Sequence, residues 1–422
     1  MTTRILLGVF VLFIIYGTTL PFRFTTDPQT VASHLHRVSL NPLESPDTGA
    51  RISLPDAAQN VLLFVPFGLL AMLALGEQPR HRFARVLVVT ALGAALSVCI
   101  EIAQLFSLDR ITSVSDVMTN TIGAGLGAIA EQRSRDAFSR VVTRASAEGY
   151  LDARIYPVIV LLVVVLLAAL QPFDVTLDVS TIFGKVHQLT ADLWQSSTLR
   201  DQGAEFVQFT LLAFFVSRSL AARDASHIVL QTTAGCALIA CALEGAQLLI
   251  TSRMPGLEHA LVKAGGAVSG AWLWRADHLR GRTAVWAPSL VIGTALAAAM
   301  QQLGPFQFSL APVPLRWAPI MSDHERTSLG ALSHVTELML TYFPMAFVLA
   351  NAWTGRRALR ASLLITLAIA TPIEITQSWV GGRLPNLTDM AISVAGAYLG
   401  VLAATRGAAA FERTVLATYS AR

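Results

Sequence analysis

A glutamate, a glutamine, an arginine and an aspartate form a polar group inside a strongly apolar stretch of this chain. They are Glu101, Gln104, Arg110 and Asp116. The planar fork of an arginine suits bidentate binding of a carboxylate or a phosphate, and a positioned carboxylate can act as a general base. These residue types therefore favour anion binding, proton transfer or an internal ion pair, because an ionisable group in an apolar span needs a partner.

The same spacing occurs three times, with the later residues 3, 9 and 15 positions after the glutamate, and we call these four positions the polar signature. The third copy has the same residue types: Glu374, Gln377, Arg383 and Asp389. The second copy replaces the aspartate: Glu244, Gln247, Arg253 and His259. Three aligned copies predict a protein built from internal repeats.

Nineteen residues after the glutamates the copies differ in charge, with Asn120, Lys263 and Ser393 at that position. We expect Lys263 to pair with Glu244 and to make the second copy mainly structural. Each copy then carries two glycines four residues apart, which is a motif of close helix packing in membranes. These pairs are Gly123 and Gly127, Gly266 and Gly270, and Gly396 and Gly400.

The glutamate and the arginine of each signature allow two interpretations. They form a clamp that closes one helix onto the next, or they line a pocket for a polar or anionic headgroup. We predict ion pairs of Glu101 with Arg110 and of Glu374 with Arg383, because an unpaired carboxylate in hydrocarbon is costly. Asp116 has a structural interpretation as well, since Ser113-x-x-Asp116 has the spacing of a capping box, which Asn386-x-x-Asp389 repeats.

A further polar residue precedes each signature on the second helix of the repeat. Asn60 stands before Pro66 in the first copy, Glu205 and Gln208 stand in the second, and Glu337 stands before Pro344 in the third. A proline inside a span frees a backbone carbonyl that another group must satisfy. We expect these polar residues to form hydrogen bonds between helices or to contribute to a site.

Composition places the chain in a bilayer. Of its 422 residues 54% are hydrophobic and only 14% are charged, against roughly 25% in soluble domains. Apolar runs long enough to span a membrane predict an all-α, polytopic bundle of about twelve transmembrane helices in three parallel four-helix repeats. The expected repeats cover residues 1–150, 151–282 and 283–422. The expected helices are 4–21, 55–76, 83–106, 114–132, 155–171, 203–222, 227–251, 257–275, 284–303, 329–352, 358–380 and 386–405.

The distribution of basic residues predicts the orientation. With both termini in the cytoplasm, twenty arginines fall on the cytoplasmic side and ten basic residues on the other, as the positive-inside rule requires. Every polar signature then lies at the outer face. The first helix is expected to be a mature span rather than a signal peptide, because its Leu20-Pro21-Phe22 ending recurs at Gln171-Pro172-Phe173 and Gly304-Pro305-Phe306. Long segments such as 23–54 are expected to be outer loops that cap the bundle.

Several classes of site are not favoured. The net charge of +4 comes from scattered arginines without a basic patch, so nucleic acid is not an expected partner. Cys99, Cys236 and Cys241 lie in apolar runs and suit buried packing rather than a disulfide framework. His34-x-His36 has no third ligand candidate nearby, so neither a metal nor another cofactor is expected.

Taken together, the motifs of the first repeat resemble the VanZ-like family of bacterial membrane proteins. The resemblance rests on Asn60, Pro66-Phe67-Gly68, Glu101-x-x-Gln104, Arg110, Asp116, Asn120 and Gly123-x-x-x-Gly127. It extends well to the third repeat and in a degraded form to the second. It implies a bacterial cytoplasmic-membrane protein of the cell envelope, in a family whose founding member is associated with resistance to the antibiotic teicoplanin. It implies no particular reaction.

The leading hypothesis is recognition of a lipid-linked or anionic headgroup at the outer leaflet. The partners would be membrane lipids or lipid-linked envelope precursors, with membrane-protein partners also open. The candidate ligand-binding residues are Asn60, Glu101, Gln104, Arg110, Asp116, Asn120, Glu374, Gln377, Arg383 and Asp389. Alternatives are a transporter or flippase, which is disfavoured because the charges gather at one face, and a non-catalytic scaffold. An enzyme is less favoured, because no nucleophile, metal set or nucleotide loop accompanies the acids.

Overall fold

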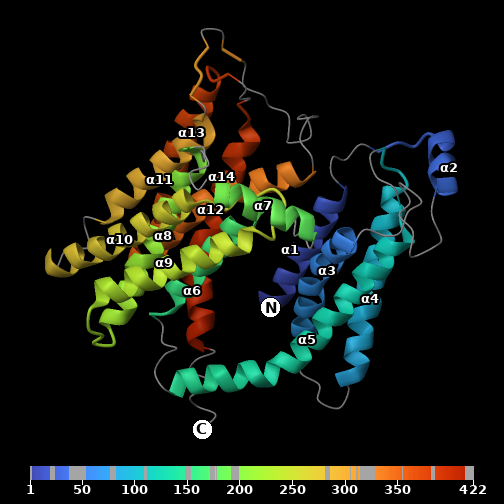
Figure 1. The fold of residues 1–422 in the computed structure, drawn as a ribbon, viewed down its shortest axis with the longest axis horizontal. Coiled ribbons are helices and arrows are strands. Elements are labelled where there is room, and N and C mark those ends of the chain that lie inside the picture. Colours follow the sequence, from blue (N-terminus) through green and yellow to red (C-terminus); the bar gives the residue numbers. More distant parts are fainter. Residues whose placement is uncertain are drawn as a thin grey trace. The chain divides into compact units, whose positions relative to one another are not determined.

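The computed structural model shows an all-helical chain (Figure 1). Among the residues that it describes no strand forms, and only isolated bridges occur. The helices group into two compact units, of which one holds residues 1–142 and the other holds most of the remaining chain. The described residues are 2–19, 24–37, 54–76, 82–108, 112–147, 154–171, 176, 178–191, 199–280, 286–304, 306–309, 312–313, 328–353, 355–381 and 385–413.

The first unit contains the four helices predicted for the first repeat. They are α1 (Thr2–Thr19), α3 (Leu54–Leu75), α4 (Arg82–Gln104) and α5 (Val114–Ala147). A small apolar core joins α1, α3, α4 and α5 through Ile14, Phe64, Phe67, Ile100 and Ala124. Helix α5 extends well beyond the expected end at residue 132, because its polar continuation is stabilised by pairs such as Glu131 with Arg135, whose charged atoms lie 2.5 Å apart.

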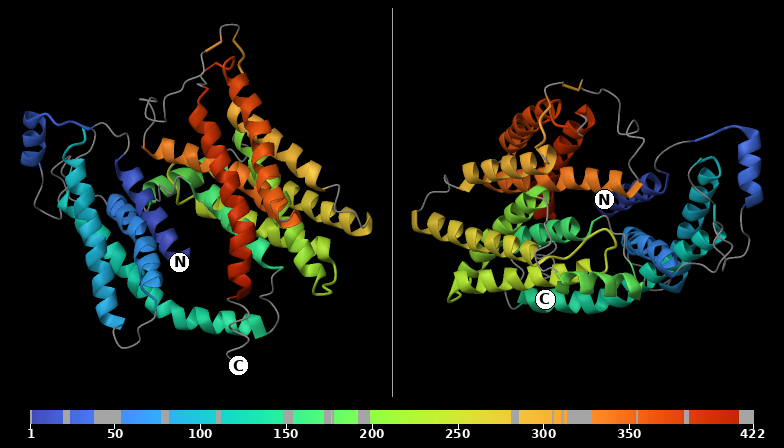
Figure 2. Two further views of the ribbon diagram at one scale, coloured as in Figure 1. Left: turned by 180° about the vertical axis from the view of Figure 1, so that it is seen from behind. Right: turned by 45° about the horizontal axis from the view of Figure 1, so that its top comes forward.

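The second unit contains the eight helices predicted for the second and third repeats, which share one apolar core. They are α6 (Tyr156–Leu170), α8 (Leu199–Ala221), α9 (Ile228–Gln247), α10 (Leu257–Arg280), α11 (Trp286–Leu303), α12 (Ser328–Ala352), α13 (Gly355–Gln377) and α14 (Leu387–Leu402). Helices α13 and α14 run side by side (Figure 2). Large buried side chains such as Phe209, Leu212, Tyr342 and Phe347 fill this core.

The helices have the composition of membrane spans. Seven described segments are long and apolar enough to cross a bilayer, and α6 is a shorter apolar helix. Exposed leucines such as Leu238 and Leu364 lie on the outer surfaces of these helices, as expected where the surrounding solvent is hydrocarbon. The seven segments are 57–75, 82–104, 202–221, 228–247, 333–352, 355–377 and 387–413.

The fourth helix of each repeat packs tightly against the second, as the glycine pairs predict. A methyl group built on the second glycine of each pair would overlap a backbone carbonyl of the neighbouring helix. The glycine–carbonyl contacts are Gly127 with Val65, Gly270 with Thr210 and Gly400 with Phe343. The absence of a side chain therefore lets the two backbones approach in all three repeats.

The long segments between the first and second helices are not simple loops, which corrects the expectation from the sequence. Each of the first two repeats has a short helix there, α2 (Pro28–Arg37) and α7 (Val179–Ala191). Asp27 accepts a hydrogen bond from the Thr30 backbone nitrogen at 3.0 Å, and Asp178 accepts one from Ser180 at 3.1 Å. These N-terminal caps stabilise short helices that hydropathy alone does not reveal.

Candidate functional site

The signature glutamate closes the turn that joins the third and fourth helices of the first repeat. Glu101 is buried, and its Oε2 accepts a hydrogen bond from the backbone nitrogen of Ser113 at 2.8 Å. Its backbone oxygen accepts a second bond from the Thr112 hydroxyl at 3.1 Å. Ser113 immediately precedes α5, so the carboxylate satisfies an otherwise unpaired amide and lies at the positive end of the helix dipole.

The same bond recurs twelve residues after the glutamate in each repeat. Glu244 Oε2 accepts from the Gly256 backbone nitrogen at 2.9 Å, and Glu374 Oε2 accepts from that of Asn386 at 2.9 Å. The three glutamates thus each bind the residue that immediately precedes the fourth helix of the repeat. Each of these bonds joins the end of the third helix to the start of the fourth.

The predicted clamp of Glu101 with Arg110 lies outside the described residues, as does that of Glu374 with Arg383. Both pairs therefore remain predictions. In the second repeat the equivalent arginine is described, and the Nε of Arg253 donates to the backbone oxygen of Gln171 at 3.0 Å. That arginine ties the turn to the end of α6.

The signature glutamine joins the third helix to the end of the first helix in every repeat. The donor is the side-chain amide, and the acceptor is a backbone oxygen, at distances of 2.9, 3.0 and 3.4 Å. The pairs are Gln104 with Thr18, Gln247 with Ala169 and Gln377 with Gln302. These three glutamines are buried, and their amide donors hold helices together.

The signature aspartates face the second helix instead of completing a capping box. Asn60 donates to Asp116 at 2.8 Å, and the Nε2 of His334 lies 2.8 Å from the Oδ2 of Asp389. Because Glu101 and Glu374 already bind the amide that a capping box would satisfy, the aspartates are available to the neighbouring helix. In the second repeat Glu205 and His259 form the matching pair at 2.8 Å.

In the third repeat a histidine on the second helix is the partner of the signature aspartate. The sequence indicates Glu337 as the polar residue of this helix, and His334, one turn earlier, is the residue that contacts the aspartate. The separation could have identified it, because the matching pairs are 56, 54 and 55 residues apart in the first, second and third repeats.

The second repeat contains a buried cation that the other two lack at this position. Lys263 is 1% exposed, and its ammonium contacts Glu244 and lies 3.0 Å from Glu205. The predicted pairing of Lys263 with Glu244 is therefore confirmed, and it extends to a second acid. In the first repeat Asn120 donates to Ser97 at 2.9 Å, and in the third the Ser393 hydroxyl donates to the backbone of Asp389 at 2.8 Å.

A small polar cavity of about 40 Å³ lies where the second and third repeats meet. Gln171, Arg253 and Lys263 of the second repeat line it, together with Gln301 and Thr341 of the third. A cavity of this size has room for water, which needs on the order of 10–15 Å³. The shared lining places the signature ends of these two repeats at the same end of their unit, as the even helix count predicts.

The short helices α2 and α7 reach the turn that follows the third helix. The Nδ1 of His34 lies 2.9 Å from the backbone oxygen of Leu105. The buried ammonium of Lys185 donates to the backbone oxygens of Ile250 and Arg253, the latter at 2.7 Å. Sequence reasoning missed both contacts, although the Asp-x-x-Thr caps of the two helices were a usable signal.

Comparison with known proteins identifies the framework. The family model described as VanZ/LLP1 matches residues 7–131 and 284–408, which together make up more than half of the chain. The two matches fall on the first and third repeats, and the repeat between them lies outside both. No curated protein and no solved structure matches the chain. On the strength of the two family matches, this multi-pass helical chain belongs to the VanZ/LLP1 family.

Proposed function

We propose that the chain is a cell-envelope protein of the bacterial cytoplasmic membrane that binds the anionic headgroup of a lipid or of a lipid-linked envelope precursor. The termini would lie in the cytoplasm and the polar signatures at the outer face. Arg110 and Arg383 would bind the headgroup, while Glu101 and Glu374 position the turns that carry them.

The observation that carries the proposal is the repeated bond from the signature glutamate to the start of the fourth helix. In the first and third repeats it holds the residue that follows the signature arginine by three positions in the sequence. A guanidinium is suited to bidentate phosphate recognition, and the start of the helix that follows it is fixed by the glutamate. In the second repeat the equivalent Arg253 is used to tie the turn to Gln171.

The other polar residues near the arginines would support the site without binding the headgroup, because their side chains bind other protein groups. Gln104 and Gln377 bind backbone oxygens of the first helix. Asn60 and Asp116 bind each other. Their role in the proposal is to hold the second, third and fourth helices in register around the turn.

The test is binding of dioleoylphosphatidylglycerol to the purified full chain in detergent, with dioleoylphosphatidylcholine as the uncharged-headgroup comparison. We expect the anionic lipid to bind more tightly, and Arg110→Ala with Arg383→Ala to weaken binding by roughly 10- to 100-fold, the loss of a charge-assisted hydrogen bond of about 1.5–3 kcal/mol. Arg110→Lys with Arg383→Lys should recover only part of the affinity. Equal affinity for the two lipids in the unmodified chain would overturn the proposal.

A non-catalytic scaffold is the second candidate, and a specific observation favours it. The side chains of Asn60, Gln104 and Asn120 each donate a hydrogen bond to a residue of another helix. A scaffold needs no ligand, so it predicts that both lipids bind alike and that substituting Arg110 and Arg383 changes only stability.

A further inference from the structure

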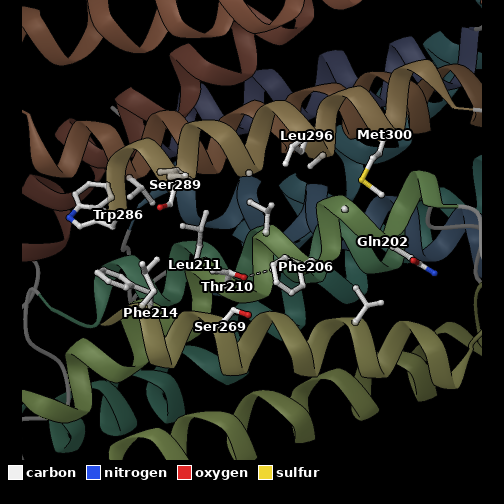
Figure 3. A pocket seen from close by; sticks show the side chains of 18 residues that line it. Gln202, Phe206, Thr210, Leu211, Phe214, Ser269, Trp286, Ser289, Leu296 and Met300 are labelled. Carbon is white, nitrogen blue, oxygen red and sulfur yellow. Dashed lines mark hydrogen bonds between the residues drawn. The ribbon is translucent and has the colours of Figure 1, made fainter. Parts of the chain in front are cut away.

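An apolar groove runs along α8 within the unit formed by the second and third repeats, between α10 and α11. Its volume is about 590 Å³. Gln202 and Met300 lie at one end, and Phe214 and Trp286 lie at the other (Figure 3). Phe206 and Leu296 are 39% and 60% exposed, so the groove opens toward the surroundings of the helices.

The groove has the length of one leaflet of a bilayer. From Gln202 to Phe214 the α8 backbone rises roughly 18 Å at 1.5 Å per residue. Half of a hydrocarbon core about 30 Å thick is about 15 Å. Because residues 202–221 form a candidate membrane span, the groove follows the hydrocarbon depth of one leaflet.

The hydroxyl groups in the walls of the groove already have hydrogen-bond partners. The hydroxyl of Thr210 donates to the Phe206 backbone oxygen at 2.7 Å, and that of Ser269 donates to the Gly265 backbone oxygen at 2.9 Å. These hydroxyls are satisfied within their own helices. An occupant would therefore be held there by dispersion and shape rather than by polar recognition.

The groove has room for an unbranched apolar chain. Its volume of about 590 Å³ has room for at least roughly twenty water-sized groups at about 30 Å³ each. Because the groove opens along a candidate membrane span, the molecules that surround it are lipids, whose acyl chains are unbranched and apolar.

One end of the groove is suited to the polar part of such a molecule. Gln202 lies one helical turn before Glu205, and Met300 precedes Gln301, and both Glu205 and Gln301 line the polar cavity described above. We propose that the groove between α8, α10 and α11 holds one hydrocarbon chain of a membrane lipid, with the headgroup of that lipid at the Gln202 end. This proposal does not depend on Arg110 or Arg383.

The experiment uses the full chain in nanodiscs that contain phosphatidylcholine with a photoactivatable diazirine in one acyl chain. Adducts are mapped by peptide mass spectrometry. We expect them to concentrate on the groove residues of α8, α10 and α11. Gly293→Phe, which fills the groove, should reduce these adducts roughly tenfold, the equivalent of about 1.4 kcal/mol.

The matched control is Gly235→Phe on α9, where an added side chain meets no neighbouring atom within 4 Å. It should leave the adducts in the groove unchanged. Leu296→Trp is a second filling variant at an exposed position, and it keeps the test valid if Gly293→Phe fails to fold. Adducts spread evenly over exposed apolar positions, or a groove signal that survives both filling variants, would overturn the proposal, as would cross-links between two copies of the chain.

Discussion

The first and second repeats use one helical framework but close it with different charges. In both, a glutamate on the third helix caps the fourth, and a glutamine on the third helix binds the end of the first. The first repeat then places Asp116 and Asn120 at the start of α5, whereas the second places His259 and Lys263 at the start of α10. The shared bonds thus define the fold, and the variable positions determine the charge that each repeat presents.

In the second repeat, basic side chains of the same repeat pair with the acidic ones. Lys263 contacts both Glu205 and Glu244, and His259 contacts Glu205. The third repeat follows the first, with Asp389 beside His334 and a serine at the position of the lysine. The second repeat therefore holds its helices together with a buried ion pair, whereas the first and third repeats keep an aspartate near the start of the fourth helix.

The largest effect that tests this comparison is expected from Lys263→Met. It leaves the buried carboxylate of Glu244 and the half-buried one of Glu205 without the lysine, and breaking a buried ion pair costs about 3–5 kcal/mol. The free energy of unfolding, measured in detergent micelles, should fall by about that amount. Adding Glu205→Gln and Glu244→Gln to the same chain should recover most of the lost stability. A Lys263→Met protein as stable as the unmodified one would show that the lysine does not stabilise the second repeat.

A smaller loss of stability is expected when the bond from the signature glutamate to the start of the fourth helix is removed. Glu101→Ala or Glu374→Ala removes the acceptor for the first amide of the following helix, and loss of such a cap costs about 0.5–2 kcal/mol. Because Gln keeps an acceptor oxygen, Glu101→Gln should lose less. Equal unfolding midpoints for Glu101→Ala and the unmodified protein would show that the cap does not stabilise the turn.

His259→Ala should have a modest effect, because Lys263 still contacts Glu205 after the imidazole is removed. We expect a loss of about 1 kcal/mol, the net value of one hydrogen bond, and unchanged binding of the anionic lipid. Thermal unfolding and lipid titration of the same sample check both parts. A binding defect as large as that of Arg110→Ala would mean that the second repeat also holds a site.

The smallest effect concerns pH and the short helix α7. Hydrogen bonds from the hydroxyls of Ser180 and Thr181 lower the pKa of Asp178 to about 2, below its ordinary value of 3.8. A lowered pKa gives stability that is present above the unfolded value and is lost as the pH falls toward 2. Hydrogen exchange of the first amides of α7 should therefore be protected at pH 5 and less protected near pH 2.5, after correction for the intrinsic rate. Asp178→Ala should remove this difference.

Hydropathy and repetition predicted the four helices of each repeat that the described residues contain, because apolar runs and glycine pairs indicate helices and their close contacts directly. They were not sufficient for α2 and α7, which are short and are held by the caps at Asp27 and Asp178. The partner of Asp389 was also missed, because a hydropathy pattern does not distinguish His334 from Glu337 one turn later. Contacts between helices depend on rotation about each helix axis, which spacing within a single helix does not fix.

The most direct measurement compares the three signature arginines in one experiment. Arg110→Ala, Arg253→Ala and Arg383→Ala are each tested for binding of dioleoylphosphatidylglycerol and for thermal unfolding. We expect weaker binding with little change in stability for Arg110→Ala and Arg383→Ala. For Arg253→Ala we expect lower stability with unchanged binding, because that side chain donates to Gln171. Weaker binding in Arg253→Ala alone, or the same behaviour in all three variants, would contradict the division between the repeats.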